Sequence, residues 1–176
     1  MRRHQGKIVF AVGLLALFLT APVVRAADLR WISPVTVVVD GRFHFSKPST
    51  TWDTQSKSIG GELFRLVNHR EGANPIIRVL EDSAARGKTS SDYARTVRKD
   101  LELRGLRNIT EDKRDVNGMT VYLFGGEDSS EGKLNYLVAA YADAALRVEC
   151  SAGKNDFSFF HNEFMAAINS VKLVGR

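Results

Sequence analysis

The sequence predicts an α+β fold, an α/β/α sandwich in which a central, mainly antiparallel sheet is flanked by helices on both faces. Three observations favour it. Short β-rich segments are joined by two-residue turns, which connect antiparallel neighbours. Several of these segments are apolar on both faces and need cover on both sides. Two longer segments carry apolar residues at helical spacing, and helices can supply that cover.

The N-terminal half of the chain predicts four short strands. Their residues are β-branched or alternate between apolar and polar, and Gly, Asp, Asn and Pro separate them. We expect Trp52, which follows the strand-ending Pro48, to pack against one end of the sandwich, because a large aromatic side chain dominates local burial. The strands are expected at residues 36–39, 42–46, 62–68 and 76–80, after a lead-in over residues 27–35.

Two segments have the pattern of amphipathic helices. The first begins near Ser90 or Ser91, either of which can cap it, and Gly105 ends it. Its apolar residues recur at helical spacing. The second helix is expected over residues 156–171. One apolar stripe of this helix contains Phe157, Phe160, Phe164, Ile168 and Val171.

The second half of the chain also predicts two hairpins. Asn117-Gly118 tolerates the positive φ that both central positions of a two-residue type I′ turn require. The strands on either side are expected at residues 109–116 and 119–124. A second hairpin, over residues 134–142 and 145–151, turns at Asp143-Ala144.

Residues 1–26 have the layout of a cleaved secretory signal peptide. A basic start precedes an apolar run of residues 8–21, and Val24-Arg25-Ala26 has small residues at the positions a signal peptidase reads. The alternative, an uncleaved anchor, would need a longer run of about 18–20 residues. No cysteine for lipid attachment lies near the cleavage point. We therefore expect an exported, periplasmic or secreted protein with one domain over residues 36–173.

The net charge of +5 comes mostly from this leader. The remaining 150 residues carry 21 basic and 20 acidic side chains, with no basic run. Nucleic acid and strong binding to a membrane surface are therefore not expected. The single cysteine, Cys150, cannot form an internal disulfide, which is compatible with a periplasm.

No residue pattern predicts catalysis, a metal site or a cofactor. Cys150 alternates with Leu146 and Val148, so we expect a buried structural thiol. His44, His69 and His161 are scattered and lack the spacing of a zinc site. Glu127 with Glu131, and Glu81 with Asp82, are expected to be solvated acids in loops.

Three short motif matches are treated as coincidences. Ser151-Ala152-Gly153-Lys154 fits S-x-x-K, but it runs from a strand into a turn instead of along a helix. Gly87-Lys88-Thr89 resembles the end of a phosphate-binding loop, but Asp82 stands where the first glycine is required. The sequon at Asn108 matters only in a eukaryotic secretory pathway.

The chain resembles the PsbP-like group, which includes the periplasmic DcrB-like proteins and a Ran-binding nucleotide-release factor. The resemblance lies in residues 43–48 followed by Trp52, in the hairpin at Asp115 to Met119, in the strand pair over 134–151, and in the closing helix. It implies an α/β/α sandwich and an accessory, protein-binding role without shared catalytic residues. Phe43, Pro48, Trp52 and Gly118 are then determinants of the fold.

The favoured function is an exported, non-enzymatic accessory domain that binds another protein at or near the bacterial envelope. A small apolar ligand or lipid-binding periplasmic protein is the alternative, and a large apolar cavity would favour it. A hydrolase that uses Ser151 or Cys150 is a third class. A solvent-open cleft joining His161 or His44 to Cys150 would favour the hydrolase.

Overall fold

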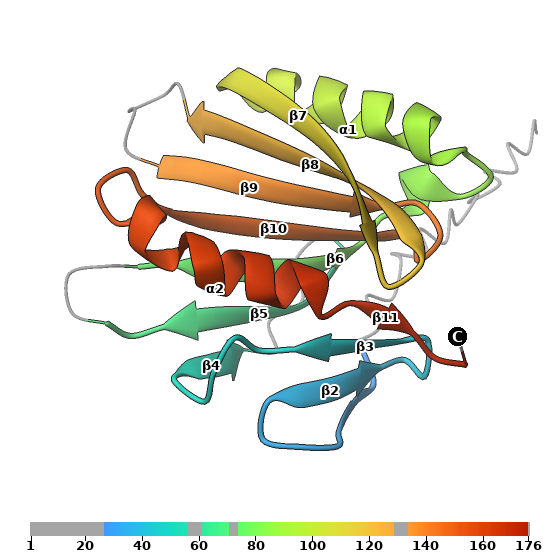
Figure 1. Cartoon of the computed structure of the whole chain (residues 1–176), viewed down its shortest axis with the longest axis vertical. Helices are drawn as coiled ribbons and strands as arrows, with labels where there is room; N and C mark the ends of the chain where they lie inside the picture. The colour runs from blue at the N-terminus through green and yellow to red at the C-terminus, as the bar shows by residue number, and fades with distance from the viewer. Residues whose placement is uncertain (1–26, 56–60, 71–73, 129–133, 176) are drawn as a thin grey trace, which may run out of the picture.

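The computed structural model describes residues 27–55, 61–70, 74–128 and 134–175, and these residues build two antiparallel sheets. A seven-stranded sheet has the order β4-β5-β6-β10-β9-β8-β7, and a four-stranded sheet has the order β1-β2-β3-β11. Helix α2 crosses the front of the large sheet in Figure 1, and α1 lies behind its β7–β8 end. The leader lies outside the described residues.

The elements follow one another along the chain with short connections. The large sheet contains β4 (Trp52–Gln55), β5 (Glu62–Asn68), β6 (Ile76–Glu81), β7 (Leu106–Val116), β8 (Met119–Asp128), β9 (Leu134–Tyr141) and β10 (Leu146–Gly153). The small sheet contains β1 (Leu29–Trp31), β2 (Thr36–Val39), β3 (Phe43–Ser46) and β11 (Lys172–Leu173). The helices are the 3₁₀ turn η1 (Ser83–Ala85), α1 (Ser90–Leu103) and α2 (Phe157–Asn169). No helix among these residues is long and apolar enough to cross a membrane.

The predicted α/β/α sandwich is wrong, because the described chain is mostly antiparallel sheet and does not form a helix layer on each face. On the front face, the small sheet shares the cover with α2: Val37, Val39, Phe43 and Phe45 join the same apolar cluster as α2. The sequence argument that doubly apolar strands need cover was sound. It erred in assigning all of that cover to helices, since a second sheet buries apolar side chains equally well.

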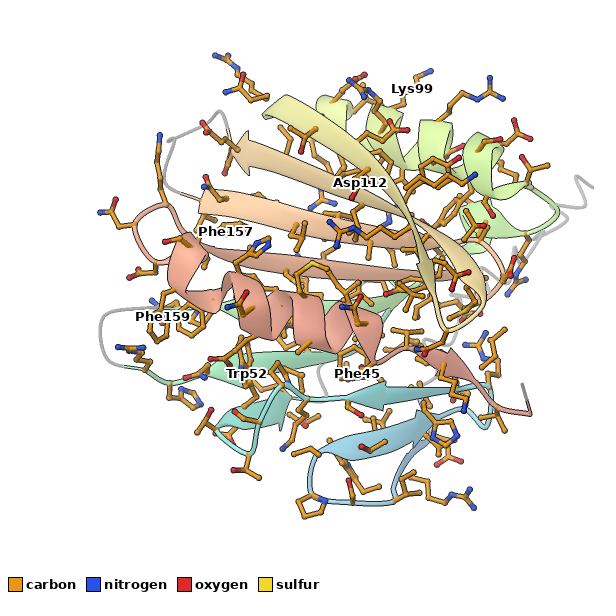
Figure 2. All side chains as sticks on the ribbon, in the orientation of Figure 1. Phe45, Trp52, Lys99, Asp112, Phe157 and Phe159 are labelled. Carbon is orange, nitrogen blue, oxygen red and sulfur yellow. The ribbon has the colours of Figure 1, made fainter. Side chains whose placement is uncertain are left out.

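The main core lies between the large sheet and this mixed layer of α2 and small sheet. Trp52 is fully buried, and its ring makes edge contacts with the rings of Phe160 and Phe164 in α2. Figure 2 shows Trp52 between β4 and this helix. The prediction that Trp52 packs in the fold is confirmed. A second, smaller cluster lies between α1 and the opposite face, where Tyr93 and Val97 contact the region of Phe124 and Val138.

The Asn117-Gly118 hairpin forms as predicted, with φ angles of 51° and 78°. Its strands β7 and β8 pair in register from Val116↔Met119 outward. The Asn117 side chain also reaches beyond the turn, because its Nδ2 donates to the backbone oxygens of Asn169, at 3.0 Å, and Val171, at 2.8 Å. A turn residue therefore satisfies carbonyl groups at the end of α2, which no later helical turn could reach.

Helix ends differ slightly from the expectations. Thr89, not Ser90 or Ser91, caps α1, since its hydroxyl accepts from the backbone N–H of Asp92 at 3.2 Å. Helix α2 ends at Asn169, before Val171, and the chain continues into β11 beside β3. A strand that was not expected, β4, begins at Trp52, and part of the expected lead-in forms β1. The strands expected at 36–39 and 62–68 have the predicted bounds.

Candidate functional site

Cys150 is fully buried in the main core, on the face of β10 that also carries Leu146 and Val148. Burial raises the pKa of its thiol well above the ordinary value, with the charge of Glu149 adding to the effect. A thiol in this state is neutral near pH 7, and the thiolate is the nucleophilic form. The predicted burial of Cys150 is confirmed.

The other residues weighed for catalysis are not assembled around Cys150. His161 is exposed on α2, and His69, exposed at the end of β5, lies 3.3 Å from an oxygen of Asp53. His44 sits in the small sheet, opposite Val38 and Lys172. Ser151 to Gly153 belong to β10, whose rise of about 3.3 Å per residue separates positions that a helix would bring together. No metal-binding group of three or more His, Cys, Asp or Glu occurs in the described ranges.

A charged cleft lies on the back face of the large sheet, beside α1. Helix α1 packs on β7, β8 and β9, and the polar faces of β5, β6 and β10 remain beyond it. The cleft has a volume of about 510 Å³. It is lined by Glu62, Arg65, Arg78, Leu80, Glu81, Asp82, Asp100, Arg104, Arg147 and Glu149.

Arg147 is the centre of the ion network in this cleft. Its Nε donates to Asp82 Oδ2 at 3.0 Å, and its Nη1 donates to Asp100 Oδ2 at 2.5 Å. The hydroxyl of Tyr93 donates to the same Asp82 oxygen at 2.8 Å. Burial would raise the pKa of Asp82, but the hydrogen bonds and charge of Arg147, together with Tyr93, outweigh burial and lower the pKa below its ordinary value. Asp82 is therefore not the solvated loop acid expected from the sequence.

The remaining carboxylates of the charged cleft are also paired with arginines. Arg104 binds both oxygens of Glu149, at 2.6 and 3.2 Å, and Arg65 binds both oxygens of Glu62, at 2.8 and 2.9 Å. Glu81 pairs with Arg42 and Arg86 instead.

These pairs use the carboxylates that could have acted as general bases. Asp100 lies in α1 and Arg104 caps its C-terminal end, whereas Arg147 and Glu149 come from β10. The network therefore fastens the helix to the sheet, and we interpret the charged cleft as structural.

A shallow, open hollow with both polar and apolar lining lies where the end of β1 and the β1–β2 connection approach β4. It has a volume of about 580 Å³ and is lined by Trp31, Ile32, Ser33, Pro34, Lys47 and Thr54. We call these six residues the Trp31 hollow. Trp31 is 40% exposed and Ile32 is 55% exposed, and the two side chains are adjacent in the chain. An exposed tryptophan beside an exposed isoleucine is the composition of a binding anchor.

One cation of the Trp31 hollow has no carboxylate partner among the described residues. The Lys47 ammonium lies over the Trp31 ring, 5.1 Å from its centroid. Its charge is therefore available to an acidic group of a bound molecule.

Sequence reasoning assigned Trp52 to the packing of the fold and did not consider Trp31. The two differ in their surroundings. Trp52 faces α2, which comes more than 100 residues later, and its indole N–H donates to Glu163. Trp31 ends an edge strand of only three residues. The Ile32-Ser33-Pro34 run after Trp31 was the available signal, because an apolar residue in a Pro-containing connection is exposed there.

We compared the chain with protein-family models, with curated proteins and with solved structures. No protein-family model matches the chain. No curated protein matches it either. Among solved structures, the cyanobacterial PsbP protein (CyanoP) of Synechocystis matches with a TM-score of 0.52 and 12% sequence identity, over 88% of this chain and 97% of that one. A Pseudomonas aeruginosa protein of unknown function, described as a putative regulator, has a TM-score of 0.44 and 12% identity, over 86% of this chain and 99% of the other.

The match to the cyanobacterial protein shows a PsbP-like fold and confirms the resemblance expected from the sequence at the level of the fold. At 12% identity it concerns the fold, because one fold can host many functions.

Proposed function

We propose that this chain, whose fold is PsbP-like, is an exported, non-enzymatic accessory protein that binds another protein at or near the bacterial envelope. The observation that carries the proposal is the Trp31 hollow. Its apolar wall is exposed to solvent, although the chain buries its other tryptophan completely. Tryptophan anchors contribute a large share of the binding energy of protein interfaces, so an exposed tryptophan beside an exposed isoleucine supports a partner-binding role.

The state of the reactive groups supports a non-enzymatic role. A catalytic centre needs a nucleophile or base that is accessible and suitably ionised. Cys150 is buried as a neutral thiol, and the carboxylates of the charged cleft are held by arginines. The hydrolase hypothesis would require one of these groups to be released.

The packing of the core also counts against the alternative of a small apolar ligand between the sheet and α2. That space contains the fully buried rings of Trp52, Phe160 and Phe164 in mutual contact, with Phe45 and Phe64 beside them. Side chains in such a layer pack at the density of an organic crystal. These residues form a packed layer and not the apolar cavity that a ligand-binding or lipid-binding protein would need.

A position-specific cross-linking experiment tests the proposal. A photo-activated amino acid placed at Ile32 should give one discrete adduct with an envelope protein in living cells. The matched control is Leu103 at the end of α1, which is also apolar and is 79% exposed. Trp31→Ala should abolish the Ile32 adduct while the melting temperature stays unchanged. Equal labelling from both positions, or an adduct that persists in Trp31→Ala, would refute the proposed binding surface.

Export is tested separately by N-terminal sequencing of the protein recovered from cells. The signal-peptide layout predicts that the recovered chain begins at Ala27. A chain that starts at Met1 and sediments with membranes would contradict this expectation and would make the protein a tethered one.

A further inference from the structure

We infer that the Trp31 hollow binds a segment of a partner protein in which a carboxylate side chain stands beside a large apolar side chain. The inference rests on the proposed function and specifies the partner's chemistry. Two features of the hollow carry it: the exposed apolar side chains of Trp31 and Ile32, and the cation over the Trp31 ring.

The apolar side chains of the hollow favour a ligand with a large apolar side chain. The hollow is shallow and open to solvent, so it suits a side chain laid on its surface. Trp31, Ile32 and Pro34 present apolar surface there, and covering it removes that surface from water. A Leu, Ile, Met or Phe side chain is the group that gains from this contact.

Lys47 favours a ligand that also carries a carboxylate side chain. Its ammonium group is 5.1 Å from the centroid of the Trp31 ring, so a carboxylate paired with it must lie next to whatever covers the ring. Docking displaces water around this pair, and a charge pair is stronger in the lower dielectric. An opposite charge at this position therefore adds affinity, whereas a like charge is rejected.

The charge of the chain favours a protein over a lipid surface. Exposed Trp and Ile side chains beside a lysine could also enter an anionic bilayer. Anionic membrane surfaces, however, attract clusters of several basic residues, and the residues after the leader carry nearly balanced charge with no basic run. A single lysine beside an apolar surface instead fits one acidic side chain of a polypeptide.

Panning of a random peptide library on the purified protein tests the inference. We expect enriched peptides to carry Asp or Glu within two residues of a large apolar residue. A synthetic peptide of the enriched sequence should bind at least tenfold more weakly to Lys47→Glu, and changing its acid to lysine should restore that binding. Lys99→Glu, at an exposed lysine of α1 (Figure 2), is the matched control and should bind like the wild type.

An NMR titration locates the bound peptide. The indole N–H signal of Trp31 should shift, while that of the buried Trp52 should not. Binding that needs Trp31 but ignores the acid and Lys47→Glu would overturn the inference and leave the proposed function standing. If no enriched peptide depends on Trp31, both fail. Binding to phosphatidylglycerol vesicles in place of peptides would also overturn both, and would identify a membrane surface as the ligand.

Discussion

Replacement of Trp52 by alanine should strongly destabilise the protein. A tryptophan buries about 150–250 Å² on folding, which at about 25 cal/mol per Å² corresponds to about 4–6 kcal/mol. Alanine keeps part of that burial, and measured losses for such replacements are about 3–5 kcal/mol. Because Trp52 is fully buried between β4 and two phenylalanines of α2, we expect a loss of about 4 kcal/mol.

Urea denaturation measures this loss. With a slope of about 2 kcal/mol per molar urea, the unfolding midpoint of Trp52→Ala should fall by about 2 M. Trp31→Ala is the matched control, because Trp31 is partly exposed, and its stability should change by no more than about 0.5 kcal/mol. Trp52→Phe keeps an aromatic ring but leaves Glu163 without its indole donor, and should cost about 1–2 kcal/mol. Equal midpoints for Trp52→Ala and Trp31→Ala would refute the packing argument.

Three further predictions concern the core thiol, the ion network and the hairpin. Cys150 should resist a thiol reagent in the native protein and react fully in denaturant, and Cys150→Ser should cost about 1–3 kcal/mol in urea denaturation, because a hydroxyl is buried in an apolar site. The lowered pKa of Asp82 means that its contribution to stability is present above about pH 4 and is lost as the pH falls through the folded-state value. Asp82→Asn should therefore lower stability at pH 7 by about 3 kcal/mol, and thermal melts between pH 7 and pH 3 should show a shallower acid decline than the wild type; an unchanged decline would contradict the role of Asp82. Asn117→Gly keeps the turn's positive φ but removes two hydrogen bonds to the end of α2, so calorimetry should show a loss of about 1–2 kcal/mol; wild-type stability would show that these bonds contribute nothing.

Local signals in the sequence predicted much of the secondary structure. Asn117-Gly118 defines its turn through the φ angles of two adjacent residues, and no distant contact is needed. The alternation around Cys150 likewise placed its side chain in the core. The strands β1 and β11 were not predicted, because segments of three and two residues are too short to show a period. They exist because each pairs with a neighbouring strand of the small sheet.

The ion network needed information that is spread along the chain. Asp82 and Arg147 are 65 residues apart and meet because β6 and β10 are neighbours in the sheet. One signal was present: the alternation that sends Cys150 into the core sends Arg147 and Glu149 together to the opposite face. Two adjacent charges of opposite sign on an otherwise apolar strand indicate partners on that face. The partners themselves, on α1 and η1, follow only from the tertiary fold.

The pairing of β11 with β3 has a consequence for when the protein can fold. The last strand lies beside one near the beginning, and the Ser170 hydroxyl accepts from the Ser46 backbone N–H across 124 residues of chain. The small sheet, and with it the cover over part of the core, stays incomplete until Lys172 and Leu173 are available. A chain that emerges from a ribosome N-terminus first must therefore keep β3 unpaired on that side until β11 has been made. Contacts of such long range also form slowly, which lengthens the interval in which a chaperone or a protease can engage the chain.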